Sequence, residues 1–98
     1  LLHPAKGKAD VIAVTNEFMG DFTMKFILKS DLGELAQLPV SVFLDNIHKM
    51  TVSVQGTNGK WVEESRILNM GFGHNHYIKF YYGADNLEIK EIVLIPNR

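Results

Sequence analysis

The main pattern along the chain is an alternation of apolar and polar residues with a period of two. It is clearest over residues 21–29, where the even positions are apolar and the odd ones polar except for Ile27. Because successive side chains of a β-strand point to opposite faces, this pattern predicts a strand with one face in a core. The same reasoning predicts strands over residues 40–44, 50–55 and 76–82, and apolar or β-branched runs predict two more over residues 10–15 and 61–68.

The last apolar segment, residues 87–95, changes parity along its length. Its first apolar residues are odd-numbered, whereas the later ones, Ile92 and Leu94, are even-numbered. A β-bulge near Lys90 and Glu91 would shift the register by one residue and reconcile the two halves. The alternative is a strand whose far half is buried on both faces.

Turn residues separate these runs, with Gly, Asn and Asp between each pair of expected strands. Only residues 30–38 suit a helix, at most one short turn with Ser30 or Asp31 as its cap and Pro39 as its end. About seven short, closely spaced strands predict an all-β, antiparallel β-sandwich or barrel. At 98 residues without a linker or repeat, the chain is expected to form one domain over residues 1–98, a module excised from a longer protein.

Composition removes several classes of function. The net charge is −1 and the ten basic residues are scattered, which argues against nucleic-acid binding because that requires a basic patch. The chain has no cysteine, so a disulfide framework and a thiolate metal site are excluded. No apolar run is long enough for a membrane span.

No catalytic arrangement stands out in the sequence. Glu63 and Glu64 are adjacent, so on a strand they face opposite sides and cannot act as a carboxylate pair. Ser53 and Ser65 lack the glycine-flanked turn of an activated nucleophile. The sequence therefore predicts a binding or structural domain and not an enzyme.

Two histidines, His74 and His76, are spaced so that on a strand they would share a face and could bind a metal. A zinc site needs a third ligand, and the sequence nominates none. We therefore expect no metal, and read both as loop histidines that make ordinary hydrogen bonds, with His74 a candidate to contact a ligand.

Aromatic and amide side chains gather near the turns. Trp61 follows the turn that contains Asn58, and Asn86 ends the turn before the last strand. Tyr77 and Tyr81 have the outward parity of their strand. A flat aromatic ring with amides around it suits a sugar, which offers an apolar C–H face and a rim of hydroxyls. The alternative for Trp61 is a core or edge-capping tryptophan.

From about residue 21 to residue 96, the order of strands, turns, tryptophan and closing strand resembles the galactose-binding-like jelly-roll domains. It is most similar to the family 6 and family 35 carbohydrate-binding modules. The resemblance implies that Trp61 is a sugar platform and that Asn86 hydrogen-bonds the ligand. In such modules an aspartate near the position of Lys90 often contributes to a structural calcium site, so the lysine argues against calcium here. Phe18 is the nearest candidate for a second platform aromatic.

Together with the aromatic and amide groups near the turns, this resemblance implies a carbohydrate-binding accessory module of a secreted, periplasmic or cell-surface protein that acts on polysaccharides. Its ligand would be a polysaccharide or oligosaccharide, and an adjoining glycoside hydrolase domain is the expected partner. The alternative is a structural or interaction domain that packs against such a domain or a partner protein through Trp61, Tyr77 and Tyr81, with no ligand site of its own.

Overall fold

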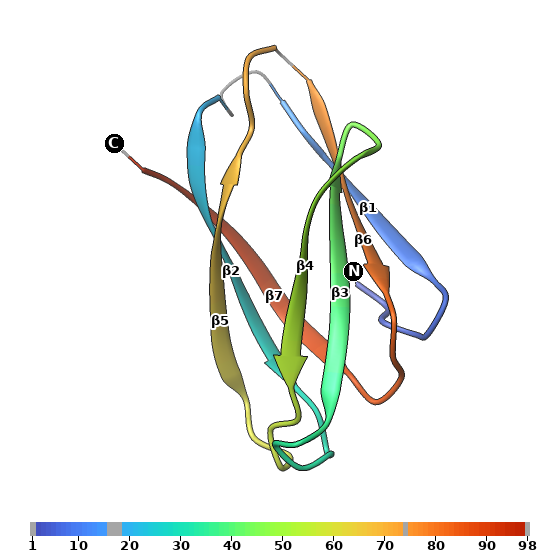
Figure 1. The fold of residues 1–98 in the computed structure, drawn as a ribbon. Coiled ribbons are helices and arrows are strands. Elements are labelled where there is room, and N and C mark those ends of the chain that lie inside the picture. Colours follow the sequence, from blue (N-terminus) through green and yellow to red (C-terminus); the bar gives the residue numbers. More distant parts are fainter. Residues whose placement is uncertain (1, 16–18, 74, 98) are drawn as a thin grey trace.

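The computed structural model describes residues 2–15, 19–73 and 75–97. Strands make up all the regular secondary structure of this part of the chain, and they lie side by side along the long axis of an elongated molecule (Figure 1). The seven described strands are β1 (Ala9–Val14), β2 (Asp21–Lys29), β3 (Gln37–Leu44), β4 (Ile47–Gln55), β5 (Val62–Asn69), β6 (His76–Tyr82) and β7 (Glu88–Pro96).

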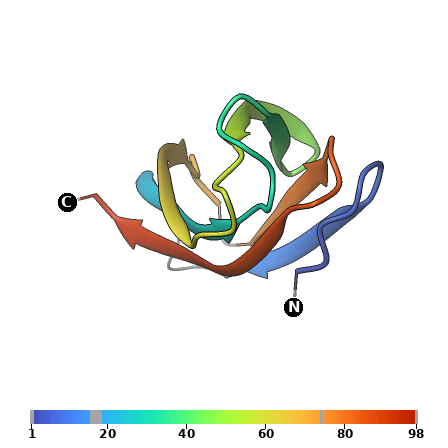
Figure 2. The same ribbon diagram turned by 90° about the horizontal axis from the view of Figure 1, so that it is seen from below.

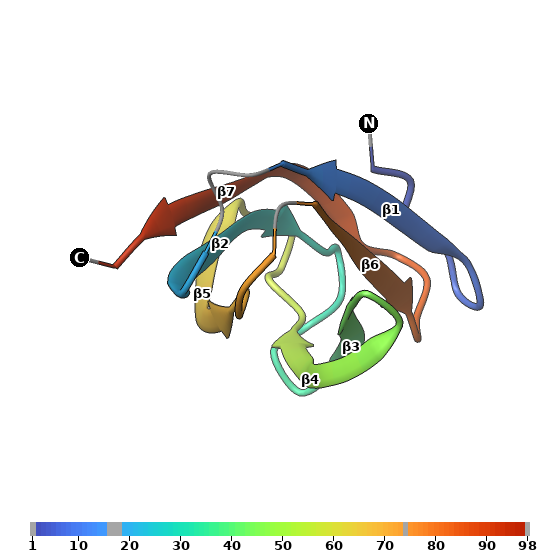
Figure 3. The same cartoon turned by 90° about the horizontal axis from the view of Figure 1, so that it is seen from above.

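The strands form two sheets that face each other, one in the order β1-β6-β3-β4 and the other in the order β5-β2-β7. Every pair of neighbours is antiparallel. The views along the strands show how the two sheets face each other (Figures 2 and 3). This confirms the predicted all-β, antiparallel β-sandwich. No helix in the described residues has the length and apolar character to cross a membrane.

The inward residues that the alternation predicted in β2, β3 and β6 form much of the core, and Leu38 and Met70, which lie outside the predicted strands, are buried with them. Phe26 on β2 meets Phe80 on β6 edge to face, with ring centroids 5.8 Å apart. Tyr82 is fully buried, and its hydroxyl donates a hydrogen bond of 2.8 Å to an Asp10 carboxylate oxygen. Burial and this bond to a carboxylate both raise the pKa of the Tyr82 hydroxyl.

The predicted irregularity in β7 is confirmed as a β-bulge. Ile27 of β2 pairs with Glu91, but the next residue, Leu28, pairs with Ile89. Lys90 is therefore passed over, and the inward parity of β7 changes from odd to even at this point. A second bulge passes over Lys49 in β4.

The expected helical turn within residues 30–38 is wrong. The segment forms a β-turn, in which the Ala36 amide donates to the Gly33 carbonyl over 3.0 Å, and strand β3 begins at Gln37. Pro39 lies inside β3 and does not end a helix. The Pro39 carbonyl accepts a 2.9 Å bond from Gly83, just past the end of β6. Because the N–H and C=O of one strand residue point to the same neighbouring strand, the missing N–H of Pro39 lies beyond the last β3–β6 pair, Val40 with Tyr82, and interrupts no strand pairing.

Candidate functional site

The loops after β2 and β4 interlock at one end of the sandwich. The Thr57 hydroxyl accepts a hydrogen bond from the Ser30 amide and donates one to the Ser30 carbonyl, both over 2.9 Å. The Gly59 amide donates to the same carbonyl over 2.8 Å. A Cβ atom on Gly56 would overlap the carbonyl oxygens of Leu32 and Gly33, so only glycine fits there. These contacts give a fixed base for the segment that carries Trp61.

Asn58 and Gly59 turn the chain toward Trp61. Both have positive φ, 54° and 79°, and the Lys60 amide donates to the Thr57 carbonyl over 3.1 Å, as in a tight two-residue turn that favours Asn-Gly. Asn58 lines a separate hollow of about 260 Å³. Asn58 therefore has a conformational role in this turn, and the hollow that it lines is not the groove beside Trp61. Its contact with a ligand stays a prediction.

Trp61 lies on the outer side of the β5-β2-β7 sheet. Its side chain remains 45% exposed, so it is not a core tryptophan. Two ammonium groups lie over the indole: Lys29 Nζ is 4.9 Å from the ring centroid and Lys90 Nζ is 5.6 Å from it. Lys29 also makes a 3.1 Å ion pair with Glu88, its cross-strand partner. Cation–π contacts of this kind hold the ring against the sheet.

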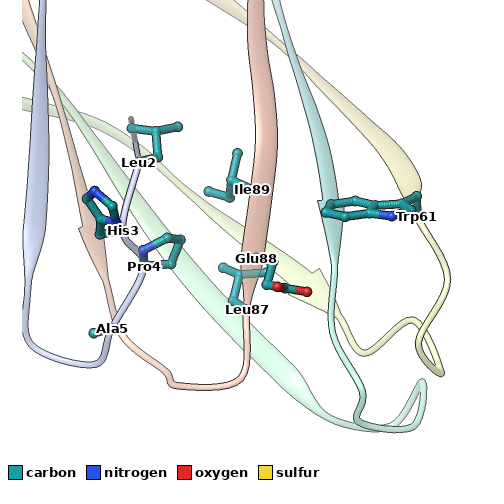
Figure 4. A pocket seen from close by; sticks show the side chains of 8 residues that line it. All are labelled: Leu2, His3, Pro4, Ala5, Trp61, Leu87, Glu88 and Ile89. Carbon is teal, nitrogen blue, oxygen red and sulfur yellow. The ribbon is translucent and has the colours of Figure 1, made fainter.

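A groove of about 430 Å³ extends from Trp61 across the start of β7. Figure 4 shows Trp61 on one side of β7 and residues 2–5 on the other, with Leu87, Glu88 and Ile89 between them. The lining thus combines an indole, aliphatic side chains, the acidic residue Glu88 and the polar residue His3. Such a mixture of apolar surface and a few polar groups is typical of a ligand site.

Hydrogen bonds fix the N-terminal side of this groove. The His3 amide donates to Asp10 over 2.7 Å, and the Lys6 amide donates to Asp85 over 2.9 Å. The Gly7 amide donates to the Tyr82 carbonyl over 2.9 Å. The segment is therefore attached to both β1 and the β6–β7 turn.

Asn86 lies at the same end of the molecule as Trp61. It has a positive φ of 61°, and its Oδ1 accepts a 3.1 Å bond from the Asp31 amide. This bond ties the β6–β7 turn to the β2–β3 loop. The side chain is exposed, and its Nδ2 makes no hydrogen bond among the described residues. Its contact with a ligand stays a prediction.

Tyr77 and Tyr81 face outward, as their parity predicted, with 59% and 43% of their surface exposed. They belong to β6, however, so they lie on the outer face of the β1-β6-β3-β4 sheet. This is the face opposite to the one that carries Trp61. The sequence grouped the three aromatics, and the structure does not bring them together.

His76 is buried, and its Nδ1 lies 2.7 Å from a carboxylate oxygen of Asp45. The hydrogen bond to His76, reinforced by one from the Tyr77 amide, lowers the pKa of Asp45. His74 and Phe18 lie outside the described residues. Among the described residues, no three His, Cys, Asp or Glu side chains come together in a way that could hold a metal ion.

Lys90 does not fit a calcium site. Calcium binds oxygen ligands, and this residue instead places an ammonium beside the Trp61 ring. The absence of a structural calcium nevertheless stays a prediction.

Comparisons with known proteins define the fold. No protein-family model and no curated protein matches the chain. A family 35 carbohydrate-binding module from an environmental isolate matches with a TM-score of 0.78 at 12% identity, over 95% of this chain and 69% of that one. A family 35 module from Clostridium thermocellum matches with a TM-score of 0.67 at 16% identity, over 89% of this chain and 66% of that one. The chain has the galactose-binding-like fold of family 35 carbohydrate-binding modules.

The same fold also matches part of a much larger enzyme. A β-glucosidase from Paenibacillus barengoltzii matches with a TM-score of 0.69 at 26% identity, over 94% of this chain but only 10% of that one. The chain therefore spans a small part of that enzyme, and about two thirds of each of the two carbohydrate-binding modules.

Sequence reasoning missed the residues that surround Trp61. Lys29, Glu88 and the segment 2–5 come from three distant parts of the chain. No signal in the sequence alone indicates Lys29 and Glu88, because strand pairing brings them to Trp61: Leu28 pairs with Val62, next to Trp61, and Lys29 pairs with Glu88.

Proposed function

We propose that this domain is a non-catalytic carbohydrate-binding module that holds a glycan in the groove beside Trp61. The exposed indole at the edge of that groove is the observation that carries the proposal. A sugar ring would stack its C–H face on the indole, while polar groups of the groove and the Asn86 amide meet its hydroxyls. The fold, shared with known carbohydrate-binding modules, supports the same function.

The proposed setting is a secreted, periplasmic or cell-surface protein that acts on polysaccharides. The match to one tenth of a β-glucosidase supports a module that is joined to a glycoside hydrolase domain. In that setting the module keeps the enzyme close to its polymer. Weak affinity is expected, because a small open groove must offset the entropy lost on binding.

Replacement of Trp61 tests the proposal. Trp61→Ala should weaken retention on polysaccharide in affinity gels by about tenfold or more, because buried aromatic contacts dominate small interfaces. Phe72→Ala is the matched control, since Phe72 is 94% exposed and lies in the β5–β6 loop, at the other end of the sandwich. Thermal unfolding checks that both variants keep the fold. Normal retention of a folded Trp61→Ala variant on every bound polysaccharide would contradict the proposal.

A second function is favoured by the opposite face. Tyr77, Tyr81 and Val11 are exposed on adjacent strands β1 and β6, and Val11 is 57% exposed. An apolar, aromatic surface of this kind suits a contact with an adjoining domain or a partner protein. In this alternative the domain is a structural element of a larger enzyme, and the Trp61 groove holds no ligand.

A further inference from the structure

The two sides of the groove beside Trp61 come from distant parts of the chain. Trp61 lies on one side of β7, and residues 2–5, the N-terminal wall, lie on the other (Figure 4). The wall precedes β1 and belongs to neither sheet. The width of the groove therefore depends on contacts outside the strand pairing.

The β6–β7 turn is connected to both sides of the groove. The Asp85 carboxylate accepts a 2.9 Å hydrogen bond from the Lys6 amide, next to the wall, and Asn86 Oδ1 accepts a 3.1 Å bond from the Asp31 amide. Asp31 lies in the β2–β3 loop, which interlocks with the segment that carries Trp61. Two neighbouring residues of one turn thus join the wall to the Trp61 side.

A second anchor ties the wall to the core. One carboxylate oxygen of Asp10 accepts bonds from the His3 amide over 2.7 Å and from the Tyr82 hydroxyl over 2.8 Å. Tyr82 is fully buried, so this anchor cannot be removed without a change in the core. Asp85 is exposed, so its anchor can be removed by itself.

We infer that Asp85 is a positioning residue for the groove, because its carboxylate holds the N-terminal wall across β7 from Trp61. The inference rests on the proposed glycan-binding function. A wall that is already held in place loses less conformational entropy when a ligand binds, which raises the affinity. Asp85 does not itself line the groove, so it acts through the wall.

Two variants of Asp85 test the inference. Asp85→Ala removes the acceptor of the Lys6 amide, whereas Asp85→Asn keeps an oxygen that can accept this bond. In affinity gels with laminarin, xylan, galactomannan, arabinogalactan and polygalacturonate, Asp85→Ala should weaken retention on the bound polymers about threefold to tenfold. Asp85→Asn should restore most of the retention. Asp21→Ala is the matched control, because Asp21 is also exposed and accepts a side-chain bond, from Asn69, but lies at the other end of β2 from Trp61.

Amide hydrogen exchange, measured by NMR, separates positioning from a general loss of stability. Without ligand, Asp85→Ala should speed the exchange of the Lys6 amide and leave that of the Gly20 amide unchanged, since Gly20 bonds the Gly71 carbonyl at the other end of the sandwich. Coupling between two sites is reciprocal. The soluble polymer of this panel that wild-type protein binds best should therefore slow the exchange of the His3 and Lys6 amides about threefold or more.

Several outcomes would overturn the inference and leave the glycan-binding function intact. They are unchanged retention of Asp85→Ala on a polymer that wild-type protein binds, an equal loss in Asp21→Ala, and exchange at the Lys6 amide that neither the variant nor the bound polymer alters. Failure of wild-type protein to bind any polymer of the panel would overturn the proposed function, and this inference with it.

Discussion

At the scale of single residues, the contact between Asp45 and His76 connects the β3–β4 turn to β6. Asp45 has a positive φ of 51° in that turn. Its two carboxylate oxygens accept bonds from the His76 ring at 2.7 Å and from the Tyr77 amide at 2.9 Å. The turn is thus tied to the strand that carries both outward tyrosines.

This contact predicts a pH dependence of stability. The pKa of Asp45 is lowered in the folded state from its ordinary value of 3.8, chiefly by the hydrogen bond from His76. Its contribution to stability is therefore present above pH 3.8 and is lost as the pH falls through the lowered folded pKa. Asp45→Asn should lower the melting temperature at pH 6, and the gap to wild type should narrow toward pH 3.

Asp31→Asn is the control for this measurement, because the Asp31 carboxylate takes part in no hydrogen bond among the described residues. Its melting temperature should follow the wild-type curve throughout. A gap between Asp45→Asn and wild type that stays constant from pH 6 to pH 3 would show that the charge of Asp45 contributes nothing.

At the scale of elements, the strands followed from the sequence because burial imposes a period of two. The parity change in residues 87–95 predicted the bulge, since a strand with one buried face must shift its register to keep apolar residues inside. The helical turn was wrong because Pro39 was read as a stop. A strand tolerates a proline where the missing N–H would have had no carbonyl of a neighbouring strand to bond. For Pro39 this holds because β6 ends at Tyr82, one residue before Gly83, which bonds the Pro39 carbonyl.

The interlocked loops offer a prediction at this scale. Gly56→Ala should lower the free energy of unfolding by about 2 kcal/mol, because its Cβ would overlap backbone oxygens that cannot move independently. Gly33→Ala is the matched control: its Cβ would meet only Asn58 Oδ1, at 3.8 Å. Urea unfolding curves measure both. Equal stability of the two variants would show that the two loops separate easily.

At the scale of the whole molecule, strand order decides which residues can act together. The resemblance to known modules singled out Trp61 and Asn86 as ligand contacts, and the structure places the two residues at the same end of the sandwich. The sequence did not predict that Lys29, Glu88 and residues 2–5 lie near Trp61, because pairing between distant strands brings these parts of the chain together. Tyr77 and Tyr81 had the right parity, but parity does not say which of two sheets a strand joins.

The separation of these two aromatic surfaces allows the two functions to be distinguished. If the Trp61 groove alone binds glycan, a Tyr77→Ser, Tyr81→Ser double variant should retain wild-type affinity, because its side chains lie on the outer face of the other sheet. Affinity gels with the same polysaccharides measure this directly. If the folded double variant loses retention while Trp61→Ala keeps it, the ligand binds to the tyrosine face and not to the Trp61 groove.

If neither variant changes retention, neither aromatic surface holds the glycan. If the isolated domain binds no polysaccharide at all, the second proposed function is favoured, in which the tyrosine face contacts an adjoining domain or a partner protein. Exposed apolar and aromatic surfaces of this kind are typical of protein–protein contacts.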